Sequence, residues 1–245
     1  MKALLLCAGL GTRLKPLTNK KPKALVELAG KSLLQWNIEK LIFHGYKQIV
    51  INVHHFADQI INFLKSNDNF GIDIQISDER DTLRDTGGGL RHARQFLEGE
   101  EHFLIHNVDI ITNLDLVEML ELHKDRGAMS TLAVRSRKTS RYLTFEDGSS
   151  EMTGWTNIKT NEIKISRISS ELVTNFAFSG VHMVNSDIFE LLPDEKVFSI
   201  IDAYLDIAKN NKVICFPHDA SYWHDVGKAE NIPAAERSLN KIKSL

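Results

Sequence analysis

The chain is poor in cysteine and in long apolar runs, and each scarcity excludes a class of protein. Only two cysteines occur among the 245 residues, at Cys7 and Cys215. This number favours buried thiols in a reducing compartment over a disulfide framework. No apolar run approaches the roughly 20 residues that cross a bilayer, and no signal-type segment opens the sequence. We therefore expect a cytoplasmic protein with no membrane partner.

The chain also lacks an excess of charge of either sign. Its 30 lysines and arginines stand against 32 acidic residues, for a net charge of −2. Because nucleic-acid-binding proteins carry a strong positive surplus, this balance argues against a nucleic-acid partner, although a local cationic pocket is compatible with it. No internal repeat or low-complexity linker is visible, so we expect one domain over residues 1–245.

What the sequence does contain is an alternation of strand and helix patterns. Apolar or β-branched runs predict strands at residues 3–8, 48–53, 72–76, 102–108, 129–135 and 213–216. Helical periodicity is found at residues 33–44, 57–65, 91–97, 114–124, 186–192, 200–209 and 229–242. This alternation predicts an α/β fold with a doubly wound, mostly parallel sheet of Rossmann-like type. Residues 142–145, 152–157, 162–166 and 175–184 instead predict short strands joined by turns. We expect a small antiparallel β lobe, inserted roughly at residues 136–184.

A loop rich in glycine and cations follows the first predicted strand. Gly9 and Gly11 let the backbone approach an anion, Thr12 adds a hydroxyl, and Arg13 and Lys23 add positive charge. Its place at the carboxyl end of a parallel strand is where such sheets bind ligands, so the pattern predicts a triphosphate-binding loop. A merely flexible connection remains the alternative.

Two better-known glycine motifs are absent. A dinucleotide fingerprint would need a third glycine near Leu14 and an acid at the end of the next strand. The segment Gly30-Lys31-Ser32 has Leu25 where an ATPase-type phosphate loop requires glycine. No Gly-x-Ser-x-Gly nucleophile motif occurs either.

Two carboxylates stand at the ends of apolar segments. Asp109 follows the strand at residues 102–108, and Asp225 precedes Gly227 near the C-terminal end. Mg²⁺ takes one or two protein carboxylates together with phosphate oxygens, so the pair suits a Mg²⁺ site beside a triphosphate. Taken singly, each aspartate is better explained as a turn or capping acid.

Two further clusters are less specific. Thr86-Gly87-Gly88-Gly89 precedes a predicted helix, where bare backbone and free N–H groups can contact a flat base, but a hinge explains the cluster equally well. The basic run from Arg135 to Arg141 is interpreted as a solvated loop, because charge runs usually are.

Together these segments resemble the sugar-1-phosphate nucleotidyltransferase family along nearly the whole chain. The loop from Gly9 to Thr18 with Pro22-Lys23 resembles the family's signature, and the glycine cluster at 86–89 its base-binding segment. Asp109 matches the first metal aspartate. The segment 174–180 resembles the strand that lines the sugar pocket, and the segment 223–227 the one that supplies the second metal aspartate. The short chain is most similar to the N-acetylmuramate-1-phosphate uridylyltransferase branch, with mannose-1-phosphate guanylyltransferases next.

The sequence departs from the family pattern at two places. Val108 stands where a glycine usually precedes the first metal acid. The Glu-Lys-Pro motif of the middle lobe is missing, and residues 154–157 occupy its region, so the family's second active-site lysine has no counterpart that can be assigned.

The resemblance implies an enzyme of nucleotide-sugar biosynthesis that transfers a nucleotidyl group from a nucleoside triphosphate to a sugar 1-phosphate and releases pyrophosphate, with Mg²⁺ as cofactor. It implies catalytic roles for Arg13 and Lys23, and metal ligation by Asp109 and Asp225. The implied nucleotide-binding residues are Ala8, Gly9, Gly11, Thr12, Arg13, Lys23, Thr86, Gly87, Gly88 and Asn107, and the implied sugar-binding residues are Asn175, Gly180 and Trp223.

The favoured substrates are UTP and N-acetylmuramate 1-phosphate, with GTP and mannose 1-phosphate as the alternative. A non-catalytic regulatory relative that binds nucleotide sugars, and a cytidylyltransferase for non-sugar phosphates, also remain open. A homo-oligomer is possible, because helix faces that close a dimer resemble those that close a core.

Overall fold

The computed structural model describes residues 1–239, and the last part of the helix expected at 229–242, residues 240–242, lies outside the described residues. The helices are α1 (Leu33–Phe43), α2 (Ala57–Ser66), α3 (Asp85–His92), α4 (Arg94–Leu97), α5 (Leu116–Asp125), α6 (Ile200–Ile207) and α7 (Ile232–Leu239). The strands are β1 (Lys2–Leu6), β2 (Glu27–Leu28), β3 (Lys31–Ser32), β4 (Gln48–Val53), β5 (Asp73–Asp78), β6 (His102–Asn107), β7 (Ile110–Thr112), β8 (Ser130–Arg135), β9 (Arg141–Glu146), β10 (Met152–Asn157), β11 (Glu162–Ile165), β12 (Val173–Asn185), β13 (Val213–Pro217) and β14 (Trp223–Asp225). Short 3-10 helices lie at Thr12–Leu14, Lys23–Leu25, Asp68–Gly71, Ser186–Glu190 and Ala229–Asn231.

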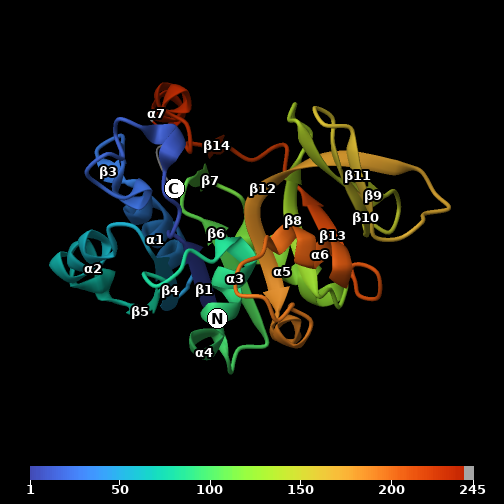
Figure 1. Ribbon diagram of the computed structural model, residues 1–245, viewed down its shortest axis with the longest axis horizontal. Helices are drawn as coiled ribbons and strands as arrows, with labels where there is room; N and C mark the ends of the chain where they lie inside the picture. The colour runs from blue at the N-terminus through green and yellow to red at the C-terminus, as the bar shows by residue number, and fades with distance from the viewer. Residues whose placement is uncertain (240–245) are drawn as a thin grey trace.

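A ten-stranded mixed sheet forms the centre of the molecule (Figure 1). Strands β5, β4, β1 and β6 are parallel neighbours, as the alternation of strand and helix patterns predicts. Strand β12 runs antiparallel to β6, and β8 pairs with β12 and in parallel with β13. The predicted α/β fold with a mostly parallel arrangement and a small antiparallel part is confirmed.

The antiparallel part is continuous with the central sheet through β12. The second half of this 13-residue strand pairs with β6, and its first half pairs with β9, which leads outward to β10 and β11. One strand is thus shared by both parts. The lobe boundaries at 136–184 stay a prediction.

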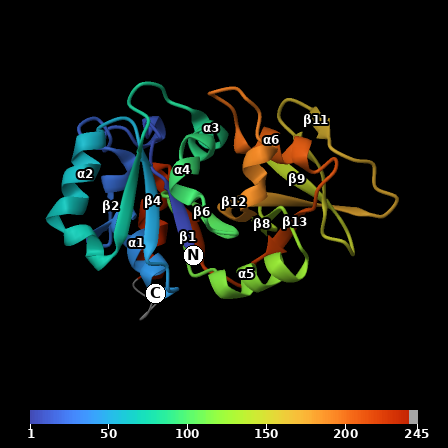
Figure 2. The same cartoon turned by 90° about the horizontal axis from the view of Figure 1, so that it is seen from below.

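Apolar side chains alternate across the sheet and build a core on each face. In β1, Ala3 and Leu5 belong to the core that the sheet shares with α1, α2, α5 and α7, while Leu4 belongs to the core that it shares with α3, α4 and α6. Figure 2 shows α3 and α6 on one side of the sheet and α5 on the other. A strand covered on both faces has a nearly continuous apolar sequence, which explains residues 3–8.

The helix expected to begin at residue 91 begins earlier, so the expectation of its start is wrong. Helix α3 starts at Asp85 and contains Gly87, Gly88 and Gly89, all of them buried. Glycine disfavours helix interiors, which is why propensity placed the start after the cluster. Close packing against residues 196–198, described below, overrides that cost. Among the described residues, no helix is both long enough and apolar enough to cross a membrane.

Candidate functional site

The loop after β1 is held in place by a buried amide in the neighbouring strand. Asn52 of β4 accepts hydrogen bonds from the backbone N–H groups of Cys7 (2.6 Å) and Ala8 (3.3 Å) through its Oδ1. Its Nδ2 donates to Oε1 of Glu79 at 2.8 Å. Glu79 is fully buried, and that burial raises the pKa of its carboxyl group. The loop therefore rests on a polar network beneath it.

Gly11 shapes the second half of this loop. Its φ of +65° is a left-handed conformation that favours glycine, and its carbonyl accepts a hydrogen bond from Thr18 Oγ1 at 2.8 Å. A Cβ at this position would lie 2.9 Å from Thr18 Cγ2 and 3.1 Å from Lys23 Cβ. The close contact ties the glycine loop to the segment that carries Lys23.

A two-stranded ribbon brings the two predicted metal carboxylates together. β14 pairs antiparallel with β7, with Asp225 opposite Ile110, and the N–H of Val226 donates to the Asp109 carbonyl at 2.9 Å. A Cβ on Gly227 would lie 2.5 Å from Asp109 Oδ2 and 2.9 Å from Asp225 Oδ1. Both carboxylates therefore face one small space, which only a glycine at 227 leaves open.

Both predicted cations lie at the same place. The Lys23 ammonium forms an ion pair with Asp109 Oδ2, and the two side chains are only 15% and 11% exposed. Arg13 Nη2 lies 3.5 Å from the position that a Cβ on Gly227 would take, so its guanidinium is near both aspartates. The structure thus joins residues from three distant segments into one charged centre.

This centre forms one wall of a cavity of about 420 Å³ at the carboxyl ends of β1 and β6. Of the residues predicted to bind nucleotide or metal, the cavity is lined by Ala8, Gly9, Arg13, Lys23, Thr86, Asn107 and Asp109. Leu83, Asp85 and Val197 complete the wall on the side of α3. The size and the mixture of apolar and charged lining suit a nucleotide.

Gly87 and Gly88 face away from this cavity. Their N–H groups donate to the carbonyl of Phe198 at 3.0 and 3.3 Å, so these groups are not free, contrary to the expectation. A Cβ on Gly87 would collide with the Phe198 ring, and one on Gly88 with the Lys196 carbonyl. The glycines are thus required for packing α3 against residues 196–198, and a contact of theirs with the base stays a prediction.

A second cavity, of about 530 Å³, adjoins the first. It lies among β9, β10, β11 and α6, and Asp85 lines both. Three cationic side chains line it, Arg137, Arg141 and Lys164. Lys164 is paired with Asp202 at 2.7 Å, whereas no ion pair of the two arginines is found among residues 1–239. The basic run at 135–141, expected to be solvated, therefore contributes two of its members to a cavity.

None of the three predicted sugar-binding residues is among those that line this cavity. Trp223 donates from Nε1 to the Ser179 carbonyl at 2.9 Å, and its ring lies under the Arg137 guanidinium. Gly180, with a φ of +77°, lies directly against the Asn107 side chain. Asn175 is exposed on β12 and, by strand alternation, points to the face opposite to Phe178, which lines the cavity.

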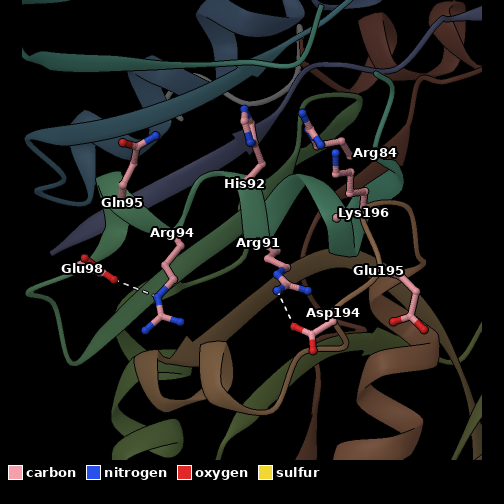
Figure 3. Close-up of a pocket in the computed structure, with 10 residues that line it drawn as sticks. Arg84, Arg91, His92, Arg94, Gln95, Glu98, Asp194, Glu195 and Lys196 are labelled. Atoms are coloured by element: carbon pink, nitrogen blue, oxygen red, sulfur yellow. Dashed lines mark hydrogen bonds and ion pairs between the residues drawn. The ribbon is translucent and has the colours of Figure 1, made fainter. Parts of the chain in front are cut away.

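A third cavity lies between helices α3 and α4 and residues 194–196, and charged side chains line it, as Figure 3 shows. Its arginines are largely paired with carboxylates. Arg91 contacts Asp194 at 2.7 Å and Arg94 contacts Glu98 at 2.9 Å. None of the loop residues 8–23 lines it, so it is separate from the first cavity.

The residues present fit a divalent metal at Asp109 and Asp225. No cluster of three or more histidine, cysteine or acidic side chains suited to a metal occurs in the described part of the chain. A site of two carboxylates is insufficient for zinc, but it matches Mg²⁺, which completes its shell with phosphate oxygens and water. The space that Gly227 leaves beside both carboxylates is consistent with this choice.

An anion loop at the sheet edge, a pair of cations and a pair of carboxylates define an enzyme that acts on phosphate groups of a nucleotide. The model of the nucleotidyl transferase family matches residues 2–241, and the chain belongs to this family. Members of the family generally use a divalent metal. The resemblance and the enzyme class inferred from the sequence are confirmed.

Individual relatives agree with this assignment. The chain is 32% identical over 242 residues to the N-acetylmuramate alpha-1-phosphate uridylyltransferase of Caulobacter vibrioides, covering 97% of this chain and 96% of the relative. It is 28% identical to the catalytic subunit beta of mannose-1-phosphate guanylyltransferase from Dictyostelium discoideum, of which it spans only 66%. A crystal structure of a putative glucose-1-phosphate thymidylyltransferase from Bacillus anthracis superposes with a TM-score of 0.80 at 19% identity, covering 100% of this chain and 97% of that one.

Sequence reasoning missed several residues that build the site. Asn52 is one, and its signal is an amide within the otherwise apolar run of β4. Asp85 and Arg137 are others, and each is placed by contacts that no local pattern predicts. Strands β7 and β14 were also missed, because three residues are too few for a periodic signal.

Proposed function

We propose that the protein transfers a nucleotidyl group from a nucleoside triphosphate to a sugar 1-phosphate. The observation that carries this proposal is the convergence of Arg13 and Lys23 with Asp109 and Asp225 at one end of a nucleotide-sized cavity. The favoured pair of substrates is UTP and N-acetylmuramate 1-phosphate, as in the name of the Caulobacter relative. The cytoplasmic location and a homo-oligomeric state stay predictions.

The reaction is an in-line displacement at phosphorus. An oxygen of the sugar 1-phosphate forms a bond to the α-phosphorus, and the bond from that phosphorus to the bridging oxygen of the leaving pyrophosphate breaks, its electron pair departing with pyrophosphate. The nucleophile is already an anion, so no general base is required. Catalysis rests on alignment and on neutralising charge.

The residues of the centre take distinct roles in this step. Arg13 binds the leaving pyrophosphate through its planar fork of donors. Lys23 exchanges its contact with Asp109 for the phosphates near the reacting phosphorus. Asp109 and Asp225 would hold Mg²⁺, which would supply charge neutralisation on the phosphate oxygens. Asn52 keeps the N–H groups of the loop in place through the bonds described above.

The alternative pair, GTP and mannose 1-phosphate, is supported by the Dictyostelium relative, of which this chain spans two thirds. A catalytically silent regulatory relative is disfavoured, because both carboxylates and both cations are present and converge.

The test is pyrophosphate release with Mg²⁺ across UTP, GTP, dTTP, ATP and CTP against the 1-phosphates of N-acetylmuramate, N-acetylglucosamine, glucose and mannose. We expect one dominant pair, and UTP with N-acetylmuramate 1-phosphate as that pair. GTP with mannose 1-phosphate would support the alternative. No release from folded protein that binds nucleotide would refute the enzymatic proposal.

A further inference from the structure

The proposed reaction brings a second phosphate group to a triphosphate, and the cations assigned so far serve the triphosphate. A sugar 1-phosphate carries up to two negative charges, which repel the triphosphate at the short distance that attack requires. A cation on the sugar side of the reacting phosphorus lowers this repulsion. Residues 154–157 contain no lysine or arginine, so such a cation would come from another element. The inference below rests on the proposed function.

Arg137 lies between the metal carboxylates and the second cavity. It belongs to the connection between β8 and β9, and its guanidinium carbon is 4.6 Å from the centre of the Trp223 ring. Trp223 is two residues from Asp225 on β14, and Asp225 is the main negative charge that acts on Arg137. Arg137 also lines the second cavity. Its charge therefore borders the second cavity and is close enough to Asp225 to interact with it.

The guanidinium of Arg137 is held in place but has donors to spare. Its Nη2 donates to the Phe178 carbonyl at 3.0 Å. Its buried Nε has no hydrogen-bond partner among residues 1–239. Half-burying a cation without a carboxylate bonded to it costs free energy, and burial lowers its pKa. Such a group is suited to an anion that arrives from the cavity.

The neighbouring Arg135 has a structural role and serves as a comparison. Its Nη1 donates to the carbonyl of Ser221 at 2.5 Å, and its Nη2 to that of Asp219 at 2.9 Å. It also lies 3.9 Å from the Asp219 carboxylate. Arg135 thus fixes the 218–221 turn, whereas the Arg137 guanidinium makes one such bond within residues 1–239.

We propose that Arg137 binds the 1-phosphate of the sugar substrate and holds its attacking oxygen toward the α-phosphorus. The guanidinium offers two adjacent donors to the phosphate oxygens, and the Trp223 ring fixes its plane. The sugar ring then extends into the second cavity, toward Arg141 and Asn157. Arg137 is in this account a specificity residue for the acceptor and not for the nucleotide.

The test uses Arg137→Met, which keeps an apolar stem over Trp223 and removes the charge, and Arg137→Lys, which keeps the charge. Lys138→Met is the matched control, because Lys138 is exposed and lines neither cavity. KM for the sugar 1-phosphate and for the nucleoside triphosphate is measured separately, with melting temperature as the check on folding. Added guanidinium is then tested for rescue of Arg137→Met.

For Arg137→Met we expect KM for the sugar 1-phosphate to rise at least about tenfold, the scale of one charge-assisted contact, while KM for the triphosphate changes less than about twofold. Arg137→Lys and added guanidinium should each recover part of the loss, and Lys138→Met should match the unaltered enzyme. The loss should be equal for every sugar 1-phosphate that the enzyme accepts.

Three results would overturn the inference while leaving the proposed function intact. One is an unchanged KM for the sugar 1-phosphate in an active Arg137→Met enzyme. Another is an equal rise in both KM values with a lowered melting temperature, which indicates a structural role. The third is a loss confined to N-acetylmuramate 1-phosphate, which places the charge against the sugar's carboxylate. Inactivity of the unaltered protein would instead refute the proposed function.

Discussion

Asp225 depends on long-range structure more than any other residue of the charged centre. It is 116 positions from Asp109 in the sequence, and the β7–β14 ribbon brings the two carboxylates together. Its Oδ1 also accepts the N–H of Gly227 at 2.8 Å. The carboxylate is therefore positioned before any ligand binds, as electrostatic catalysis requires.

Replacing Asp225 with Asn should lower turnover at least about a hundredfold, the scale of losing a main electrostatic element. Nucleotide affinity should change much less, because Arg13 and Lys23 remain. Steady-state rates and a nucleotide titration measure the two effects. Asp187→Asn, at an exposed 3-10 helix, is the control and should retain full turnover. Near-normal turnover of Asp225→Asn would refute the metal role.

A substitution at Gly11 tests whether its left-handed conformation and its contact with Thr18 stabilise the loop. Gly11→Ala should destabilise the protein and weaken triphosphate binding, because φ is +65° and Thr18 Cγ2 lies 2.9 Å from the new Cβ. Gly30→Ala is the matched control, since its φ is +83° but no atom lies within 4 Å. Both should lose about 1–2 kcal/mol of unfolding free energy from backbone strain, and Gly11→Ala more. Equal losses in urea denaturation would show that the Thr18 contact is unimportant.

At the scale of elements, the packing of α3 against residues 196–198 forms one wall of the first cavity. Thr86 of α3 also accepts the N–H of Ile200 at 3.0 Å and so holds the start of α6. α6 lines the second cavity through Ile201 and Asp202. This contact therefore fixes the position of the first cavity relative to the second.

Gly87→Ala should separate α3 from this segment, because the new methyl group would meet the Phe198 ring and lie 3.0 Å from its carbonyl oxygen. Overpacking of this kind costs about 1–3 kcal/mol. In the double variant Gly87→Ala with Phe198→Ala, the loss should be smaller than the sum of the two single losses, because space is restored. Urea denaturation measures all three. A double variant that is strictly additive would show that the two residues do not contact each other.

The elements themselves differ in how well the sequence predicts them. Strands β1, β4 and β6 are covered on both faces and have long apolar runs, so their sequence patterns were sufficient to predict them. The start of α3 was missed because propensity opposes three glycines in a helix, and only contact with residues 196–198 explains them. The basic run likewise does not predict that Arg137 is half-buried with its guanidinium over the Trp223 ring, because this contact joins residues far apart in the sequence.

At the scale of the whole molecule, buried histidines make stability depend on pH. Burial lowers the pKa of His106 and of His182 to about 3, and that of His123 and of His218 to about 4. In the unfolded chain these groups titrate near about 6.5. Between those values the unfolded chain binds protons that the folded chain does not. The free energy of unfolding therefore falls as pH falls below about 6.5.

Each such histidine removes at most about 1.4 kcal/mol per pH unit in that window. Urea denaturation at pH 7.5, 6 and 5 should show the decline. His182→Gln should make the decline less steep, because the amide does not titrate and can still bond to the Tyr204 hydroxyl, which lies 2.5 Å from Nδ1 of the histidine. Stability that is constant from pH 7.5 to 5 would contradict the burial of neutral histidines.

Part of the site could be predicted from the sequence, and there is a physical reason why the rest could not. The signature loop and Asp109 follow covered strands directly, so local sequence predicts their place at the sheet edge. The pairing of Asp225 with Asp109 was predicted from the ligands that Mg²⁺ prefers and from resemblance, because the ribbon that brings the two together is too short to detect in the sequence. The second cavity depends on side chains from β9, β10, β11 and α6, whose meeting only the folded chain shows.

The most direct test of the central claim follows the α-phosphate of the nucleotide. The enzyme is incubated with Mg²⁺, a sugar 1-phosphate and a nucleoside triphosphate labelled at its α-phosphorus, and labelled products are separated while pyrophosphate is measured. We expect the label to appear in a nucleoside diphosphate sugar, with one pyrophosphate released for each label transferred. Label that stays in the triphosphate, or that appears as nucleoside monophosphate whether or not the sugar 1-phosphate is present, would contradict the claim.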